Sequence, residues 1–143
     1  MHAAGVAYRA IALFVKGNAM NRKKKILLVD DAETILLMEK MFLGKASYDF
    51  VLARDGQQAI ELAESELPDL ILLDIVMPKL DGFEACLRLK SSSVTRSIPI
   101  ILVTTRGEGA NVEKGFENGA TDYITKPIDG LELVSKVRSY LGE

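Results

Sequence analysis

Short uninterrupted apolar runs alternate with longer amphipathic segments from residue 25 to the end of the chain. Runs such as 26–29 and 70–73 are apolar at every position, which is typical of strands buried on both faces of a sheet. The predicted strands are 26–29, 49–53, 70–73, 98–103 and 123–124, and the predicted helices are 32–43, 56–67, 82–90, 110–118 and one after Asp129. This alternation predicts an α/β fold, a doubly wound five-stranded parallel sheet covered by helices on both sides.

Local signals refine the expected helices. Asp81 and Asp129 precede two of them and are expected to act as N-caps, because a carboxylate can accept hydrogen bonds from the first free backbone N–H groups. We expect the last two helices to pack on the sheet through apolar stripes. These stripes are Val112 with Phe116, and Leu131 with Val134, Val137 and Leu141.

Length and composition narrow the class of protein. The 143 residues suit one domain, expected at 25–143, and the net charge of −2 gives no basic excess for direct nucleic-acid binding. The single cysteine, Cys86, excludes an internal disulfide and suits the cytoplasm. Residues 1–24 are interpreted as a tail, either disordered or an over-long translated start. Its apolar stretch at 10–15 is too short to span a membrane, so no membrane partner is expected.

Polar residues with chemical potential follow the predicted strands. Strand one ends in Asp30-Asp31, strand three in Asp74 and strand four in Thr104, and Lys126 follows strand five. Sites in open parallel sheets form beyond the carboxyl ends of the strands, so these side chains are expected to meet at one rim. Three neighbouring carboxylates repel one another unless a cation holds them, and oxygen ligands without His or Cys favour Mg²⁺.

This combination suits phosphoryl transfer. Mg²⁺ and the Lys126 ammonium can neutralise charge on phosphoryl oxygens, Asp74 can act as the nucleophile, and the Thr104 hydroxyl can donate a hydrogen bond. Two other classes share parts of the pattern. A hydrolase with an aspartate nucleophile commonly has a second acid two residues later, where this chain has Val76. A flavin carrier needs a first loop that cradles phosphate, and Asp30-Asp31 would repel one; a yellow protein would reopen that interpretation.

From Lys25 to Leu141 the chain resembles the receiver domains of bacterial response regulators, including the stand-alone chemotaxis type. The matching stretches are 26–31, 70–82, 103–105 and 119–127. The resemblance implies the flavodoxin-like strand order 2-1-3-4-5, for which the chemotaxis receiver is a standard example.

The resemblance also implies roles for the rim residues. Asp74 would be the phosphoacceptor, Asp31 would bind Mg²⁺ directly, Asp30 would bind it mostly through water, and the backbone carbonyl of Val76 would be a further ligand. Lys126 would pair with Asp74 or its phosphate, ahead of a cis Lys126-Pro127 peptide bond.

Thr104 and Tyr123 would form the switch pair that reshapes the surface of the fourth helix, fifth strand and last helix. The expected partners are a sensor histidine kinase or phosphotransfer protein and a downstream protein that reads this surface. The chain is expected to be a single-domain signalling protein, not an enzyme, and a monomer or weak dimer. Val76 and Arg106 would flank the path of hydrolytic water and so prolong the phosphorylated state.

Overall fold

The structure is a computed structural model that describes residues 22–105 and 109–143. Its elements are β1 (Lys24–Val29), α2 (Glu33–Leu43), β2 (Tyr48–Ala53), α3 (Gly56–Glu66), β3 (Leu70–Asp74), α4 (Gly82–Ser91), β4 (Ile100–Thr105), α5 (Gly109–Glu117), β5 (Asp122–Lys126) and α6 (Gly130–Leu141). Each predicted strand and helix is present close to its expected bounds. The interpretation of the tail concerns residues 1–24, of which 1–21 lie outside the described residues.

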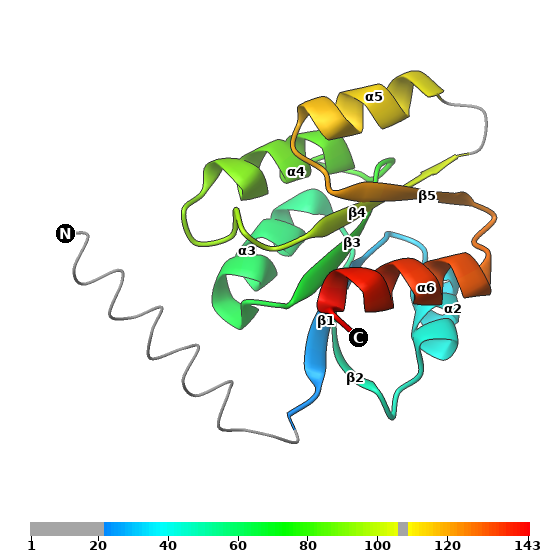
Figure 1. The fold of residues 1–143 in the computed structure, drawn as a ribbon. Coiled ribbons are helices and arrows are strands. Elements are labelled where there is room, and N and C mark those ends of the chain that lie inside the picture. The colour runs from blue at the N-terminus through cyan, green and yellow to red at the C-terminus, as the bar shows by residue number, and fades with distance from the viewer. Residues whose placement is uncertain (1–21, 106–108) are drawn as a thin grey trace, which may run out of the picture.

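The strands form one parallel sheet in the order β2-β1-β3-β4-β5, which confirms the predicted fold class (Figure 1). Val29 pairs with Leu73, Asp74 with Val103, and Thr105 with Lys126. Because every pair is parallel, the carboxyl ends of β1, β3, β4 and β5 lie at the same edge of the sheet. The chain order reverses between β1 and β3, and at such a switch point ligands bind.

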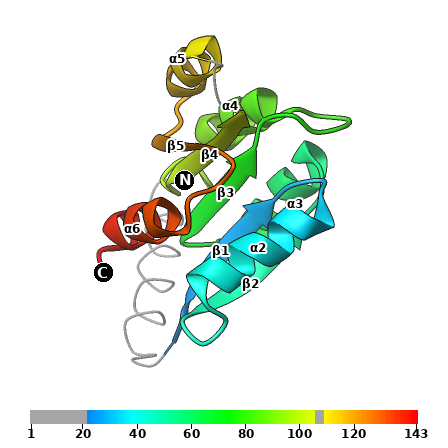
Figure 2. The ribbon, with the colours of Figure 1, turned by 90° about the vertical axis from the view of Figure 1, so that its right-hand side faces the viewer.

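Helices cover both faces of the sheet, as Figures 1 and 2 show. Side chains of α2 and α6, including Leu36 and Leu133, pack on one face with Leu28 and Leu72 of the central strands. Side chains of α3 and α4 pack on the other with Leu27 and the rest of a second cluster. Alternating strand residues therefore belong to opposite layers, and this alternation also decides the direction of each side chain at the carboxyl edge.

Two packing predictions were wrong. Leu131 is 85% exposed, and Leu133 is buried in its place, because a stripe through Val137 can begin at either residue. Phe116 is 46% exposed. Its neighbour Gly115 faces the sheet so closely that a Cβ there would lie 2.4 Å from Leu102 Cδ1, and the next helical residue then points about 100° away.

Candidate phosphoacceptor site

An acidic cluster lies at the carboxyl edge of the sheet. One carboxylate oxygen from each of Asp30, Asp31 and Asp74 lies within 4.8 Å of the others. Asp30 and Asp74 are buried, whereas Asp31 is exposed. The structure thus brings together the three carboxylates that the sequence predicted at one rim of the sheet.

A backbone contact holds the Asp30 side chain, and the backbone at Asp74 packs against the start of α4. Asp30 Oδ1 accepts a hydrogen bond of 2.9 Å from the Ala32 amide, which begins the turn into α2. Asp74 lies under the start of α4, where Gly82 N–H donates to the Ile75 carbonyl at 2.8 Å. A Cβ at position 82 would lie 2.3 Å from the Asp74 carbonyl oxygen, so only glycine permits this close approach.

Lys126 completes the cluster from the end of β5. Its Nζ lies 3.2 Å from Asp30 Oδ2 and 3.2 Å from Asp74 Oδ1, so one ammonium bridges two buried carboxylates. The peptide bond between Lys126 and Pro127 is cis, as expected. The ion pairs link β1, β3 and β5 across the switch point of the sheet.

The cluster carries more negative than positive charge. Burial, followed by repulsion from Asp30, raises the pKa of Asp74 to about 6, although Lys126 acts in the opposite direction. Burial disfavours the Lys126 ammonium, but the carboxylates of Asp74 and Asp30 outweigh it and raise the pKa of Lys126. At neutral pH one ammonium therefore faces three carboxylates, an arrangement that a further cation would stabilise.

The donor set fits Mg²⁺. All three side chains offer carboxylate oxygens, and the buried Asp30 Oδ2 atom has the Lys126 ammonium 3.2 Å away. Mg²⁺ prefers oxygen ligands and commonly binds through a few carboxylates and water. Asp31 is exposed and can meet an ion that keeps part of its water shell.

Three further residues were predicted to act beside this cluster: Thr104, Val76 and Arg106. Thr104 is buried, its Oγ1 has no hydrogen-bond partner among the described residues, and it follows Val103, the partner of Asp74 in the sheet. The Val76 side chain is 69% exposed. Arg106, the other residue expected to flank the phosphoryl group, lies outside the described residues.

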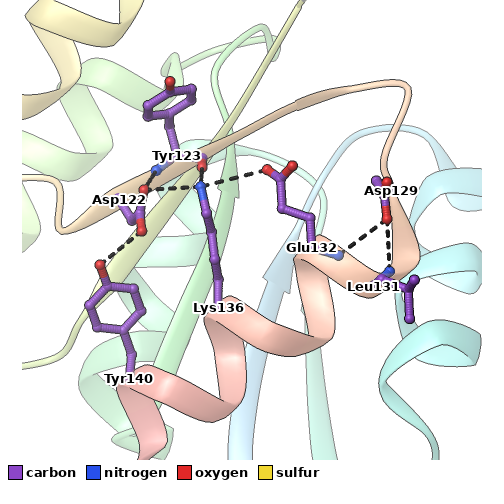
Figure 3. A network of polar contacts seen from close by, with 7 residues as sticks. All are labelled: Asp122, Tyr123, Asp129, Leu131, Glu132, Lys136 and Tyr140. Carbon is purple, nitrogen blue, oxygen red and sulfur yellow. Dashed lines mark hydrogen bonds and ion pairs between the residues drawn. The ribbon is translucent and has the colours of Figure 1, made fainter.

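Tyr123 lies beside a network of polar contacts between β5 and α6 (Figure 3). Its ring makes an edge contact with Phe116 at 6.1 Å between centroids, and Lys136 Nζ lies 5.0 Å from its centroid. Lys136 also donates to the Tyr123 carbonyl at 2.7 Å and pairs with Asp122 at 3.2 Å. Sequence reasoning did not single out Lys136, because a lysine on an amphipathic helix normally reads as a solvated charge.

Sequence reasoning also missed Glu39. Its side chain is 1% exposed on the sheet-facing side of α2, and neither carboxyl oxygen has a hydrogen-bond partner among the described residues. Burial, followed by the charge of Asp30, raises the pKa of Glu39 to about 9. The spacing of Leu36, Glu39 and Leu43 was the available signal, since positions i, i+3 and i+7 share one helix face.

Comparison with known proteins identifies the family. Residues 26–138 match the model of the response regulator receiver domain, and the chain belongs to this family. It is 42% identical over 118 residues to the alkaline phosphatase synthesis transcriptional regulatory protein PhoP of Bacillus subtilis. That alignment covers 82% of this chain and 48% of the relative, so the chain spans about half the length of this curated protein.

Solved structures agree with this assignment. The Vibrio cholerae chemotaxis protein CheY4 matches with a TM-score of 0.77 and 29% identity, over 83% of this chain and 99% of that one. The receiver domain of the sensor histidine kinase PA1611 from Pseudomonas aeruginosa matches with a TM-score of 0.78 and 30% identity, over 85% and 100%. That structure has a magnesium ion coordinated in its active-site cleft. Within the residues described for our chain, no helix is long and apolar enough to cross a membrane.

Proposed function

We propose that this chain accepts a phosphoryl group on Asp74 from a histidine kinase or phosphotransfer protein in a Mg²⁺-dependent reaction, and that this changes a protein-binding surface. The observation that carries the proposal is the cluster of Asp30, Asp31 and Asp74 bridged by Lys126. Membership of the receiver family supports it. The same family supports a cytoplasmic location and a role as signalling phosphoacceptor, not as an enzyme with a separate substrate.

Asp31 would hold Mg²⁺ directly, Asp30 mostly through water, and Asp74 and the Val76 carbonyl would complete the protein ligands. The Val76 carbonyl accepts no backbone hydrogen bond from a described residue, which supports its role as a ligand. When bound, Mg²⁺ neutralises charge that develops on the phosphoryl oxygens. An Asp74 oxygen attacks phosphorus as the bond to the donor breaks, and Lys126 binds a phosphoryl oxygen.

The buried hydroxyl of Thr104 supports the second half of the proposal. Its Oγ1 lacks a partner among the described residues and can donate to a phosphoryl oxygen on Asp74. Movement of Thr104 toward the phosphoryl group would leave space for the Tyr123 ring, which now lies against Phe116. The surface of α5, β5 and α6 would then change, and a downstream protein that prefers one form would shift the equilibrium reciprocally.

Labelling with a small phosphodonor tests the acceptor. Incubation with acetyl phosphate and Mg²⁺ should add one phosphoryl group, detected by intact-protein mass spectrometry, and EDTA should prevent it. Asp74→Asn should abolish the added mass because the amide is not a nucleophile, whereas the exposed Asp49 provides a matched control in Asp49→Asn. Retention of the full acid-labile label by Asp74→Asn would refute the assignment.

Beryllofluoride, a phosphoryl mimic, tests the switch separately. Amide NMR signals of Phe116 and Tyr123 should shift when beryllofluoride and Mg²⁺ are added, and the shifts should be lost in Thr104→Ala. The Thr105→Ala variant is the control, since Thr105 is the exposed neighbour on the same strand. Equal shifts in the parent and Thr104→Ala would show that Thr104 does not transmit the change.

A further inference from the structure

Glu39 has a carboxyl side chain at a buried position of α2 where an apolar side chain is expected. It lies on α2 between Leu36 and Leu43, both of which belong to the apolar layer under this helix. Glu39 is only 1% exposed, and both of its carboxyl oxygens lack a hydrogen-bond partner among the described residues. A buried polar group without a partner destabilises the fold, so its presence demands an explanation beyond packing.

The phosphoacceptor cluster lies on the same side of the sheet as Glu39. Leu28, Leu72 and Ile124 point into the layer beneath α2 and α6. Because strand side chains alternate, the residues two positions later, Asp30, Asp74 and Lys126, point to that side as well. The charges that act on Glu39 are those of these same three residues, with Asp30 the strongest.

The Lys126 ammonium would need another hydrogen-bond acceptor if Mg²⁺ and a phosphoryl group engaged its present carboxylate partners. An ammonium has three N–H donors, and Asp30 Oδ2 and Asp74 Oδ1 each lie 3.2 Å from its nitrogen. Mg²⁺ and a phosphoryl group would engage the same two carboxylates. The ion pair between Lys126 and Asp30 therefore competes with metal binding, unless the ammonium has another acceptor within the protein.

We propose that Glu39 is a positioning residue for phosphoryl transfer, whose buried carboxyl group accepts a hydrogen bond from Lys126 when Mg²⁺ binding draws Asp30 away from the ammonium. This rests on the proposed function. Lys126 exchanges Asp30 for Glu39 and keeps another N–H for the phosphoryl oxygen. Glu39 thereby lowers the cost of releasing Asp30, and it holds the ammonium beside Asp74.

Calorimetric titration of Mg²⁺ into the full chain tests the exchange without requiring phosphorylation. Glu39→Leu removes the acceptor and should weaken Mg²⁺ binding roughly tenfold, the scale of one hydrogen bond to a charged group. Glu39→Gln keeps an acceptor oxygen and should recover part of the affinity. Glu33→Gln is the control, because it alters the same residue type on the exposed face of α2.

A double-mutant cycle shows whether Glu39 acts through Lys126. In a Lys126→Met background, Glu39→Leu should leave Mg²⁺ affinity unchanged, because there is no ammonium to reposition. Parent-like affinity of Glu39→Leu would overturn the inference, and so would a loss that is equal with and without Lys126. Failure of the parent itself to bind Mg²⁺ would instead contradict the proposed function. Urea unfolding of each variant verifies folding, and Glu39→Leu should be at least as stable as the parent.

Discussion

Two lysines on neighbouring elements show how similar ion pairs can serve different purposes. Lys126 at the rim and Lys136 in the network between β5 and α6 have nearly the same side-chain exposure, 28% and 27%. Their carboxylate partners differ. Asp30 and Asp74 are 1% and 6% exposed, whereas Asp122 is 21% exposed. The lysines are therefore comparable, and any difference in behaviour comes from the acids around them.

The Asp122 carboxylate is stabilised by two hydrogen bonds and an ion pair. It accepts hydrogen bonds from the Tyr123 amide at 2.7 Å and the Tyr140 hydroxyl at 2.8 Å, and it pairs with Lys136 (Figure 3). Partial burial tends to raise the pKa of Asp122, but these hydrogen bonds outweigh it and hold that pKa below its ordinary value. Asp74 shows the opposite shift. In the network Lys136 also pairs with Glu132 at 3.6 Å, and hydrogen bonds from neutral groups add to the stabilisation of Asp122. At the rim three carboxylates lie beside one ammonium, so the rim is the region that can receive a cation.

The largest expected effect comes from replacing each lysine by methionine and measuring stability in the absence of metal. Lys126→Met leaves buried carboxylates without their cation and should lower the free energy of unfolding by about 3 kcal/mol. Lys136→Met acts on a more exposed pair and should cost about 1 kcal/mol at most. Urea unfolding at pH 8 measures both. Saturating Mg²⁺ should restore most of the loss in Lys126→Met and none in Lys136→Met, and equal losses in the two variants would remove the contrast.

The fold and the rim were accessible from sequence because each depends on a local rule. Uninterrupted apolar runs indicate buried parallel strands, and the residue after such a run must lie at the carboxyl edge. Asp30, Asp74 and Lys126 could thus be brought together before any distance was known. Their pairing across the sheet, with one ammonium between two acids, adds only the geometry.

Other residues depend on the angle at which a helix meets the sheet, and sequence patterns define that angle poorly. Glu39 was missed because acidic residues on helices normally face water, whereas here it lies on the buried stripe of α2. Leu131 and Phe116 were expected to be buried and are exposed, because neighbouring residues occupy the sheet-facing positions. Packing, not propensity, decides between adjacent stripes that are equally apolar.

A smaller effect is the change in stability when an aspartate is replaced by asparagine, which should have opposite signs at the rim and in the network. The folded state raises the pKa of Asp74 from 3.8 to about 6, so the stability that this group contributes is present below its ordinary pKa and is lost as pH rises through about 6. Asp74→Asn should therefore raise the free energy of unfolding at pH 8 in EDTA by about 1 to 2 kcal/mol.

Asp122→Asn should do the reverse. Its pKa is lowered by folding, so its contribution is present above the ordinary value and is lost as pH falls below it. The variant should lose about 1 kcal/mol or less at pH 8 and approach the parent as pH falls below the ordinary range of an aspartate carboxyl group. Chemical unfolding of both variants at several pH values measures these differences, and a loss of stability in both at pH 8 would contradict the assigned imbalance.

The smallest expected effect is the response to salt. The Debye length falls from about 10 Å at 0.1 M to about 3 Å at 1 M, so salt screens the partly exposed pair of Lys136 and Asp122 more than the pairs that Lys126 forms with buried acids. The cost of Lys136→Met should therefore shrink by about 0.3 kcal/mol between these concentrations, while that of Lys126→Met changes less. Lys24→Met corrects for general salt effects, because Lys24 is exposed and forms no ion pair with a described residue. Burial of the acids is the proposed cause of the contrast between the two lysines. A stronger salt dependence for Lys126→Met than for Lys136→Met would contradict it, because it would show that salt ions reach and screen the charges at the rim.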